Sequence, residues 1–240
     1  MLGNGMSHGM YNPATVWSSD TSMFFDGVND VATYNASSDQ NITNHFSVSL
    51  WFKAAEIAHD VSLFQIRKSH GSKSVLRLKI YYKVDTKTLV VRRISSTESS
   101  DIATELTVSL PIQTIVTSST NICFTMENPD NMRLYVNGQL ASNLGQATPE
   151  WPTSDLPTLI NIGAADENSF GEYFNGWIRD INVFTGGITA EQVLDIYNNA
   201  EPKDESSSPA ITYNWTSNNQ YQGLLGSVAP PLIVSNYATS

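Results

Sequence analysis

Residues 131–140 read NMRLYVNGQL. Leu134 and Val136 alternate with more polar neighbours, a period of two that is typical of a half-buried strand. Asn137 and Gly138 follow, and this pair readily adopts the two positive φ angles of a type I′ turn. We therefore expect the chain to fold straight back into a second strand, so the stretch predicts a β-hairpin.

The residues on both sides of this hairpin predict many further short strands. Residues 46–53 read FSVSLWFK. One face of this strand is formed by Phe46, Val48, Leu50 and Phe52, and the other by Ser47, Ser49, Trp51 and Lys53. Similar patterns predict strands at 23–34 (two short ones), 61–66, 75–82, 89–94, 105–110, 122–126, 158–163, 174–184 and 211–215.

One helix is expected after Gly186-Gly187. Thr189 is a good N-cap and Gln192 stands three residues later, which is the spacing of a capping box. Ile188 and Val193 are spaced to form a hydrophobic staple. The helix is predicted at 189–198, with Val193, Leu194 and Tyr197 as an apolar stripe that docks on a sheet edge or an end of the sandwich.

The composition favours one large all-β domain with extensions. The chain has 240 residues, and only 15% are charged, below the roughly one quarter that is usual in soluble domains. The N-terminus, MLGNGMSHGM, lacks the apolar core of a signal peptide. Cys123 is the only cysteine, so an internal disulfide is excluded, and we expect it to be a small buried hydrophobe.

A dozen short strands and one helix predict an all-β fold, a two-sheet antiparallel jelly-roll sandwich. FFDGVNDVATY, FSVSLWFK, NMRLYVNGQL, LINIG and the closing strand with AEQV follow one another in an order that resembles the laminin-G-like, concanavalin A-like lectin domains. The resemblance covers residues 23–199 and implies the same jelly roll. Residues 1–22 are then an N-terminal arm, and 200–240 hold a linker, a returning strand and a C-terminal tail.

One departure from the family pattern concerns residues 211–215, ITYNW. They resemble a strand that family members commonly carry ahead of the FDG segment, but here they follow the helix. We expect this strand to take the place of the family's first strand, with Trp215 buried between the sheets.

Catalytic motifs are missing from the sequence. Glycosidases that share this sandwich resemble one another in a Glu-x-Asp-x-Glu or Glu-x-Asp-x-x-Glu strand, which places carboxylates on one face. The nearest match, Glu127 to Asp130, contains a proline and lies in a turn. The four histidines are scattered, with no pairing that suggests a metal. We therefore do not expect an enzyme.

A polar loop at residues 164–173 is the first candidate binding site. Family members often hold calcium or a glycan with acidic and amide groups in such rim loops, and aromatic rings can stack on a sugar. The glycan-binding candidates are Asp166, Glu167, Asn168, Tyr173 and Trp177. The alternative is a solvated loop whose Asp and Asn stabilise turns. No full set of oxygen ligands is visible, so calcium stays unassigned and no cofactor is expected.

Charge marks a second candidate. Nine of the 13 lysines and arginines lie between residues 67 and 93 against one acid, Asp85, so this segment carries +8 in a chain of net charge −10. Such a basic ribbon suits an acidic protein or an anionic glycan. The docking-surface candidates are Arg77, Lys79, Lys83, Arg92 and Arg93. The alternative is an outer face paired with acids from neighbouring strands, or lysines that protect an edge. Nucleic acid fits poorly with the acidic remainder.

Two classes of function remain. The first is a non-enzymatic structural or adhesion protein, such as a virion fibre, decoration or minor capsid protein. It would belong to a virion or an extracellular surface assembly, where its two tails contact other protein chains and it displays a glycan- or protein-binding surface. The second is a free-standing soluble carbohydrate-binding lectin. A glycoside hydrolase-like enzyme is a distant third. No run of apolar residues reaches membrane-spanning length, so membrane insertion is not expected.

Overall fold

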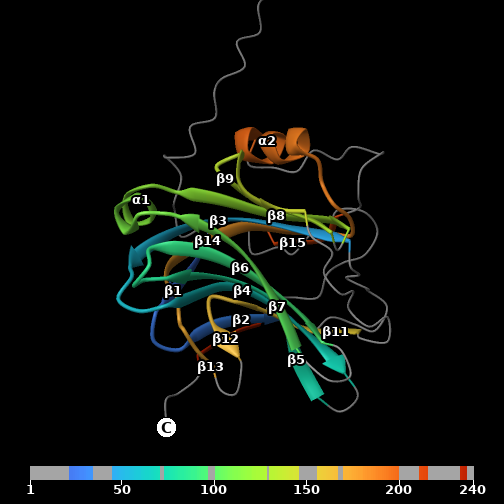
Figure 1. The fold of residues 1–240 in the computed structure, drawn as a ribbon. Coiled ribbons are helices and arrows are strands. Elements are labelled where there is room, and N and C mark those ends of the chain that lie inside the picture. The colour runs from blue at the N-terminus through green and yellow to red at the C-terminus, as the bar shows by residue number, and fades with distance from the viewer. Residues whose placement is uncertain are drawn as a thin grey trace, which may run out of the picture.

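The computed structural model describes residues 22–34, 45–70, 73–96, 101–128, 130–145, 156–166, 170–199, 211–215 and 233–236. Within these ranges two seven-stranded antiparallel sheets, here called sheet A and sheet B, pack face to face (Figure 1). The all-β, two-sheet jelly-roll sandwich expected from the sequence is therefore confirmed.

Sheet A carries the closing strands of the domain. Its order is β1 (Met23–Asp26), β14 (Asn175–Phe184), β3 (Phe46–Glu56), β8 (Thr120–Asn128), β9 (Asn131–Val136) and β10 (Gln139–Leu144), with β15 (Ile211–Trp215) also on β14. β1 pairs with residues 175–178 of β14, and β15 pairs with residues 181–184. The two strands therefore share one edge of β14 from end to end.

Sheet B carries the basic segment. Its order is β16 (Ile233–Asn236), β2 (Asp30–Tyr34), β11 (Leu156–Ile162), β4 (Val61–His70), β5 (Lys73–Lys83), β6 (Thr88–Ser96) and β7 (Asp101–Ser109). A small hairpin of β12 (Ala165–Asp166) and β13 (Phe170–Gly171) follows β11. Strands β12, β13 and β16 were not expected from the sequence. The other strands of sheet B match the predicted ones, although their ends differ by a few residues.

The β9–β10 hairpin forms as predicted. Asn137 and Gly138 have φ angles of 50° and 74°, as a type I′ turn requires. The turn is also tied to the neighbouring strand, because the Asn121 N–H donates to Asn137 Oδ1 (2.8 Å) and the Asn137 N–H donates to the Asn121 carbonyl (2.9 Å). The hairpin thereby fixes the register of sheet A at this edge.

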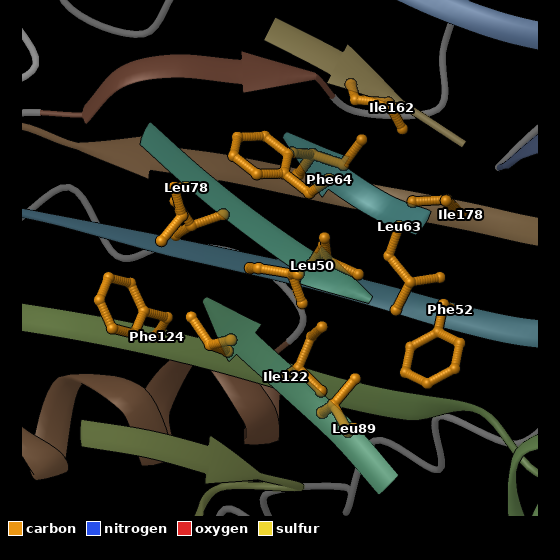
Figure 2. Packing of buried hydrophobic residues seen from close by; sticks show 14 of the residues in the cluster. Leu50, Phe52, Leu63, Phe64, Leu78, Leu89, Ile122, Phe124, Ile162 and Ile178 are labelled. Carbon is orange, nitrogen blue, oxygen red and sulfur yellow. The ribbon is translucent and has the colours of Figure 1, made fainter. Parts of the chain in front are cut away.

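The core lies between the two sheets, where side chains from both interdigitate (Figure 2). Leu50 and Phe52 of β3 and Phe124 of β8 point inward from sheet A, while Phe64 and Leu78 point inward from sheet B. Each such side chain stabilises the fold by roughly 1.5–3 kcal/mol when fully buried. The predicted alternation in β3 is therefore confirmed: one face of the strand lies in the core, and the other face lies on the outside of the sandwich.

Helix α2 (Ala190–Asn199) lies on the outer face of sheet A (Figure 1). The capping box is present, since the Gln192 N–H donates to Thr189 Oγ1 and the Thr189 N–H donates to Gln192 Oε1. Val193 and Ile196 are buried. They belong to an outer cluster with Cys123, Tyr135, Phe184 and Ile188. The prediction that the stripe docks on an edge or an end of the sandwich was wrong, because sheet A offers apolar side chains on this outer face too.

A buried hydroxyl fixes the segment that leads from β14 to α2. Ser47 Oγ donates to the Gly186 carbonyl (2.8 Å) and accepts from the Ile188 N–H (3.0 Å).

A short helix, α1 (Ile112–Thr117), was not expected from the sequence, and it buries Ile115. It links β7 in sheet B to β8 in sheet A.

The returning strand at residues 211–215 pairs with β14, with Trp215 opposite Ile181. It is therefore a paired strand on the edge of β14 beside β1, as predicted. That it takes the place of the family's first strand stays a prediction. The burial of Trp215 lies outside what the structure describes. So do the N-terminal residues 1–21 and the rest of the chain beyond residue 199, apart from β15 and β16.

Candidate functional site

The polar loop and the basic strand, two separate candidates in the sequence, meet on the outer face of sheet B. The loop is anchored to β4, because the Gly163 N–H donates to the Leu63 carbonyl (3.2 Å) and the Ser62 N–H donates to the Glu172 carbonyl (2.8 Å). Glu172 has a positive φ of 50°. Its carboxylate contacts Lys79 Nζ at 2.8 and 2.9 Å.

This contact is part of a larger group of side chains that surrounds a tyrosine. Three cations approach the Tyr81 ring: Lys79 Nζ at 4.8 Å from its centroid, and Lys83 Nζ and Arg92 Cζ at 5.6 Å each. Glu105 accepts from Arg92 Nε (2.6 Å) and from the Tyr81 hydroxyl (3.3 Å). We call this group the Tyr81 cluster; its members are Lys79, Tyr81, Lys83, Arg92, Glu105 and Glu172.

Strand register explains why these residues converge. Lys79 of β5 is paired with Arg92 of β6, which is paired in turn with Glu105 of β7. Directly paired residues of antiparallel strands lie on the same face, so one row crosses three strands. Burial raises the pKa of Tyr81 to about 12, with the nearby Arg92 charge acting against it. The phenol therefore stays a neutral hydrogen-bond donor at physiological pH.

The basic ribbon expected from the sequence is not a continuous exposed surface. Arg77, Lys79 and Arg93 are 0%, 2% and 1% exposed. Arg93 is paired with Leu78, a core residue, so it faces inward, where it donates to Ser95 Oγ (2.6 Å). The prediction of an exposed docking surface is therefore wrong for these three residues. Lys83 and Arg92 remain partly exposed.

The glycan-binding candidates of the sequence do not form one described group. Glu167 and Asn168 lie outside the described residues, and Asp166 is in β12, paired with Phe170. Tyr173 is half-buried. Trp177 lies in β14 of sheet A, where it contacts Phe24.

Phe24 and Trp177 form an aromatic pair on the outer face of sheet A. Their ring centroids are 5.1 Å apart and their planes are tilted by 56°. Phe24 is 51% exposed and Trp177 is partly exposed. The register places Phe24, Trp177 and Lys53 in one row across β1, β14 and β3. Sequence reasoning missed Phe24, although the alternation in β1 implies that one of two adjacent phenylalanines must face outward.

Helix α2 covers the outer side chains of the neighbouring row of sheet A. Trp51 is buried because Tyr197 of α2 stacks on its ring at 5.5 Å and the Arg179 guanidinium lies 5.3 Å from it. Arg179 is paired with Trp51 just as Trp177 is paired with Lys53. The exposed aromatic pair therefore lies one row beyond the area that α2 covers.

No cluster of metal-ligating side chains and no membrane-spanning helix is found in the part of the chain that the structure describes. It holds no group of three or more His, Cys, Asp or Glu residues that could bind a metal ion. None of its helices has the length and apolar character needed to cross a membrane. Cys123 is fully buried, and burial raises the pKa of its thiol, so the thiol stays protonated.

The family model described as the concanavalin A-like lectin/glucanases superfamily matches residues 25–194. The chain belongs to this superfamily. The lectin-like resemblance seen in the sequence motifs is therefore confirmed. Among curated proteins, none matches this lectin-like chain.

Solved structures share the fold at low sequence identity. A heptameric SAP-like pentraxin from Limulus polyphemus is 14% identical, with a TM-score of 0.55, and the match covers 91% of this chain and 95% of the pentraxin. The CBM40 of Ruminococcus gnavus IT-sialidase, bound to α2,3 sialyllactose, is 11% identical, with a TM-score of 0.52 and coverages of 75% and 100%. At such identities the similarity shows the lectin-like sandwich alone.

A third structure is a domain from a larger enzyme. Domain 4 of AbnA, a GH43 extracellular arabinanase from Geobacillus stearothermophilus, was solved in complex with arabinotriose. It is 18% identical, with a TM-score of 0.51, and the match covers 73% of this chain and 76% of that domain.

Proposed function

We propose that this lectin-like chain is a carbohydrate-binding module that uses the aromatic pair on sheet A as its sugar platform. The observation that carries the proposal is the exposure of Phe24 and Trp177 side by side, 5.1 Å apart. Two adjacent exposed aromatic rings keep a large apolar area in contact with water, and such patches mark interaction sites more often than single exposed side chains do. The solved relatives in complex with sialyllactose and arabinotriose support a carbohydrate as the ligand class.

The chemistry of the pair suits a sugar ring. The C–H groups on one face of a pyranose pack against an aromatic plane, while its hydroxyls need hydrogen-bond partners at the rim of the contact. Lys53 stands next to Trp177 in the same row and is partly exposed, so its ammonium can donate to a hydroxyl. This surface therefore combines an apolar platform with a polar donor.

Titration of the full chain tests the proposal. Glycan-array screening identifies a ligand, and calorimetry then compares the variants Trp177→Ala and Phe24→Ala. Each should weaken binding about tenfold or more, as expected for loss of an aromatic anchor. Ile102→Ala is the matched control, because Ile102 is also an exposed apolar side chain, at 40%, but lies on β7 in sheet B. Equal affinity of all variants, or no glycan bound, would contradict the proposal.

We infer that the module binds its glycan without cleaving it. The support is the sequence, in which no strand carries the Glu-x-Asp-x-Glu spacing that glycosidases of this sandwich share. Prolonged incubation of the chain with its bound oligosaccharide should release no shorter product in mass spectrometry. The appearance of a shorter sugar would make the chain an enzyme.

A role in a larger assembly, such as a virion fibre, decoration or minor capsid protein, is the second candidate. Leu140 of β10 and Leu194 of α2 are 54% and 40% exposed. Leu194 lies against Gly138, two residues before Leu140. Together with the polar composition and the long terminal segments, this apolar area supports self-association on a virion or extracellular surface.

Sedimentation velocity of the full chain tests the assembly candidate. The sedimentation coefficient should rise with concentration, and the double variant Leu140→Ser with Leu194→Ser should remain monomeric. A wild-type chain that stays monomeric at all concentrations would leave the free-standing lectin as the better description.

A further inference from the structure

The Tyr81 cluster lies on the outer face of sheet B, on the other side of the sandwich from the aromatic pair of sheet A. Its charged side chains are only partly covered: Arg92, Glu105 and Glu172 are 33%, 30% and 35% exposed. The Lys79 side chain is 3% exposed, and its ammonium contacts both Glu172 oxygens. The cluster is thus an outer charged layer with one buried cation beneath it.

The two acids of the cluster are held in different ways. Glu105 is on β7, next to its partner Arg92 on β6, so both are fixed in the sheet. Glu172 instead belongs to the loop between β13 and β14, and its backbone is tied to β4 through Ser62. Because its carboxylate is one third exposed, it can rotate into water while the backbone stays in place.

We propose that the Tyr81 cluster binds the anionic group of a saccharide, a carboxylate or a sulfate, and that this group replaces the Glu172 carboxylate at Lys79. Lys83 and Arg92 lie on the same face, within 5.6 Å of the Tyr81 ring, and add charge-assisted hydrogen bonds to the anion. The inference that the ligand is a saccharide rests on the proposed function, while the inference that it is anionic rests on the Tyr81 cluster alone.

Because the ligand anion must displace the Glu172 carboxylate, Glu172 is the residue that makes the site prefer anionic saccharides over neutral ones. A neutral sugar cannot take the place of the Glu172 carboxylate in the ion pair with the buried Lys79 ammonium, so displacement of Glu172 by a neutral sugar would lose that ion pair, which is costly. An anionic group satisfies the same ammonium and gains the two further cations.

Paired variants of the full chain test the site. Glu172→Gln removes the internal competitor and should tighten binding of a carboxylate-bearing or sulfated oligosaccharide about fivefold, the upper range for loss of one partly exposed ion pair. Arg92→Gln should weaken it about tenfold, as for loss of a charge-assisted hydrogen bond. The matched controls are Glu127→Gln and Arg133→Gln, because that pair has similar exposure, 37% and 29%, but lies on sheet A.

The probes are a hyaluronan hexasaccharide for carboxylates, a heparin hexasaccharide for sulfates and maltohexaose as the neutral sugar, each titrated by calorimetry at two salt concentrations. Tightening by Glu172→Gln with the first or the second probe, and no change with Glu127→Gln, supports the site and names the anion. Equal effects of both glutamate variants would show a general charge effect and overturn it. No binding of either anionic probe by the wild type and Glu172→Gln would overturn it as well.

These outcomes separate the site from the proposed function. Anionic binding that depends on Glu172 and Arg92 but not on Trp177 would support this site even if neutral glycans fail to bind at the aromatic pair. Neutral binding that depends on Trp177, with no anionic binding, would support the aromatic pair alone.

Discussion

At the scale of single residues, Gly163 occupies a position that tolerates no side chain. It has a φ of 81°, and a Cβ atom there would lie 2.3–2.4 Å from the Phe25 ring. Phe25 itself is a core residue that packs on Phe174. Gly163 therefore lets the start of the loop pass close to the core before the loop reaches Glu172.

Substitution of Gly163 should be strongly destabilising. Gly163→Ala should lower the free energy of unfolding by about 2–4 kcal/mol, because it combines a strained φ with overpacking of Phe25. Urea denaturation measures the loss. Gly145→Ala is the matched control, since a Cβ at Gly145 meets no atom within 4 Å, and its effect should stay within about 0.5 kcal/mol. Equal losses of unfolding free energy in Gly163→Ala and Gly145→Ala would mean that the close approach of Gly163 to the Phe25 ring does not matter for stability.

Tyr81 makes a prediction about pH. Its pKa is raised from 10.0 to about 12 by burial. Since the unfolded phenol ionises first, the unfolded state gains stability between pH 10 and 12, and the folded state loses stability over the same window. The wild type should therefore lose more thermal stability from pH 8 to pH 11 than Tyr81→Phe does. Other tyrosines and lysines titrate in both proteins, so the difference isolates Tyr81; parallel pH curves would refute the shift.

At the scale of elements, helix α2 covers part of the outer face of sheet A. Its N-terminus is fixed by the capping box of Thr189 and Gln192, and its far end by the stack of Tyr197 on Trp51. Cys123 lies in the cluster beneath it and is fully buried. The reactivity of this single thiol therefore reports how often α2 leaves the sheet.

Loss of the cap should increase that opening. Thr189→Ala removes the oxygen that accepts from Gln192, at a cost of about 1 kcal/mol. Labelling of Cys123 by a thiol reagent under native conditions should then speed up about fivefold, the equivalent of that energy. Thr189→Ser keeps the hydroxyl and should label like the wild type. If all three proteins label at one rate, Cys123 is reached by some motion that does not involve the first turn of α2.

At the scale of the whole molecule, the last strands of the chain complete sheets that were begun at its start. β15 covers residues 181–184 of β14 beside β1, and β16 pairs with β2. An exposed strand edge is a template for pairing with another chain. Residues 211–215 and 233–236 are therefore part of the sandwich.

Truncation tests this. Removal of residues 200–240 should lower the melting temperature by several degrees and cause association, because it bares the β14 edge. Removal of 216–240 keeps β15 and bares only β2, so it should have a smaller effect. Removal of 237–240 leaves both strands and is the control. Unchanged melting and monomeric behaviour in the longest truncation would show that β15 does not contribute.

Local patterns in the sequence were sufficient for the long strands, for helix α2 and for the family, but not for α1, β12, β13 and β16. The alternation in residues 46–53, the Asn-Gly turn and the Thr189–Gln192 spacing act over a few residues, where backbone preferences and hydrogen bonding decide the outcome. All three are present in the structure. They also defined the sandwich, because alternating strands of this number must bury one face each.

What covers the second face of each sheet was decided only by tertiary structure. Alternation places Trp51 and Lys79 on outer faces, but α2 buries the first, and Glu172, 93 residues further on in the chain, covers the second. Likewise, the register of β5 and β6 turns Arg93 inward, while Phe24 and Trp177 stay exposed together. These outcomes depend on contacts between residues far apart in the chain, and the energy of such contacts is not encoded in any single stretch of sequence.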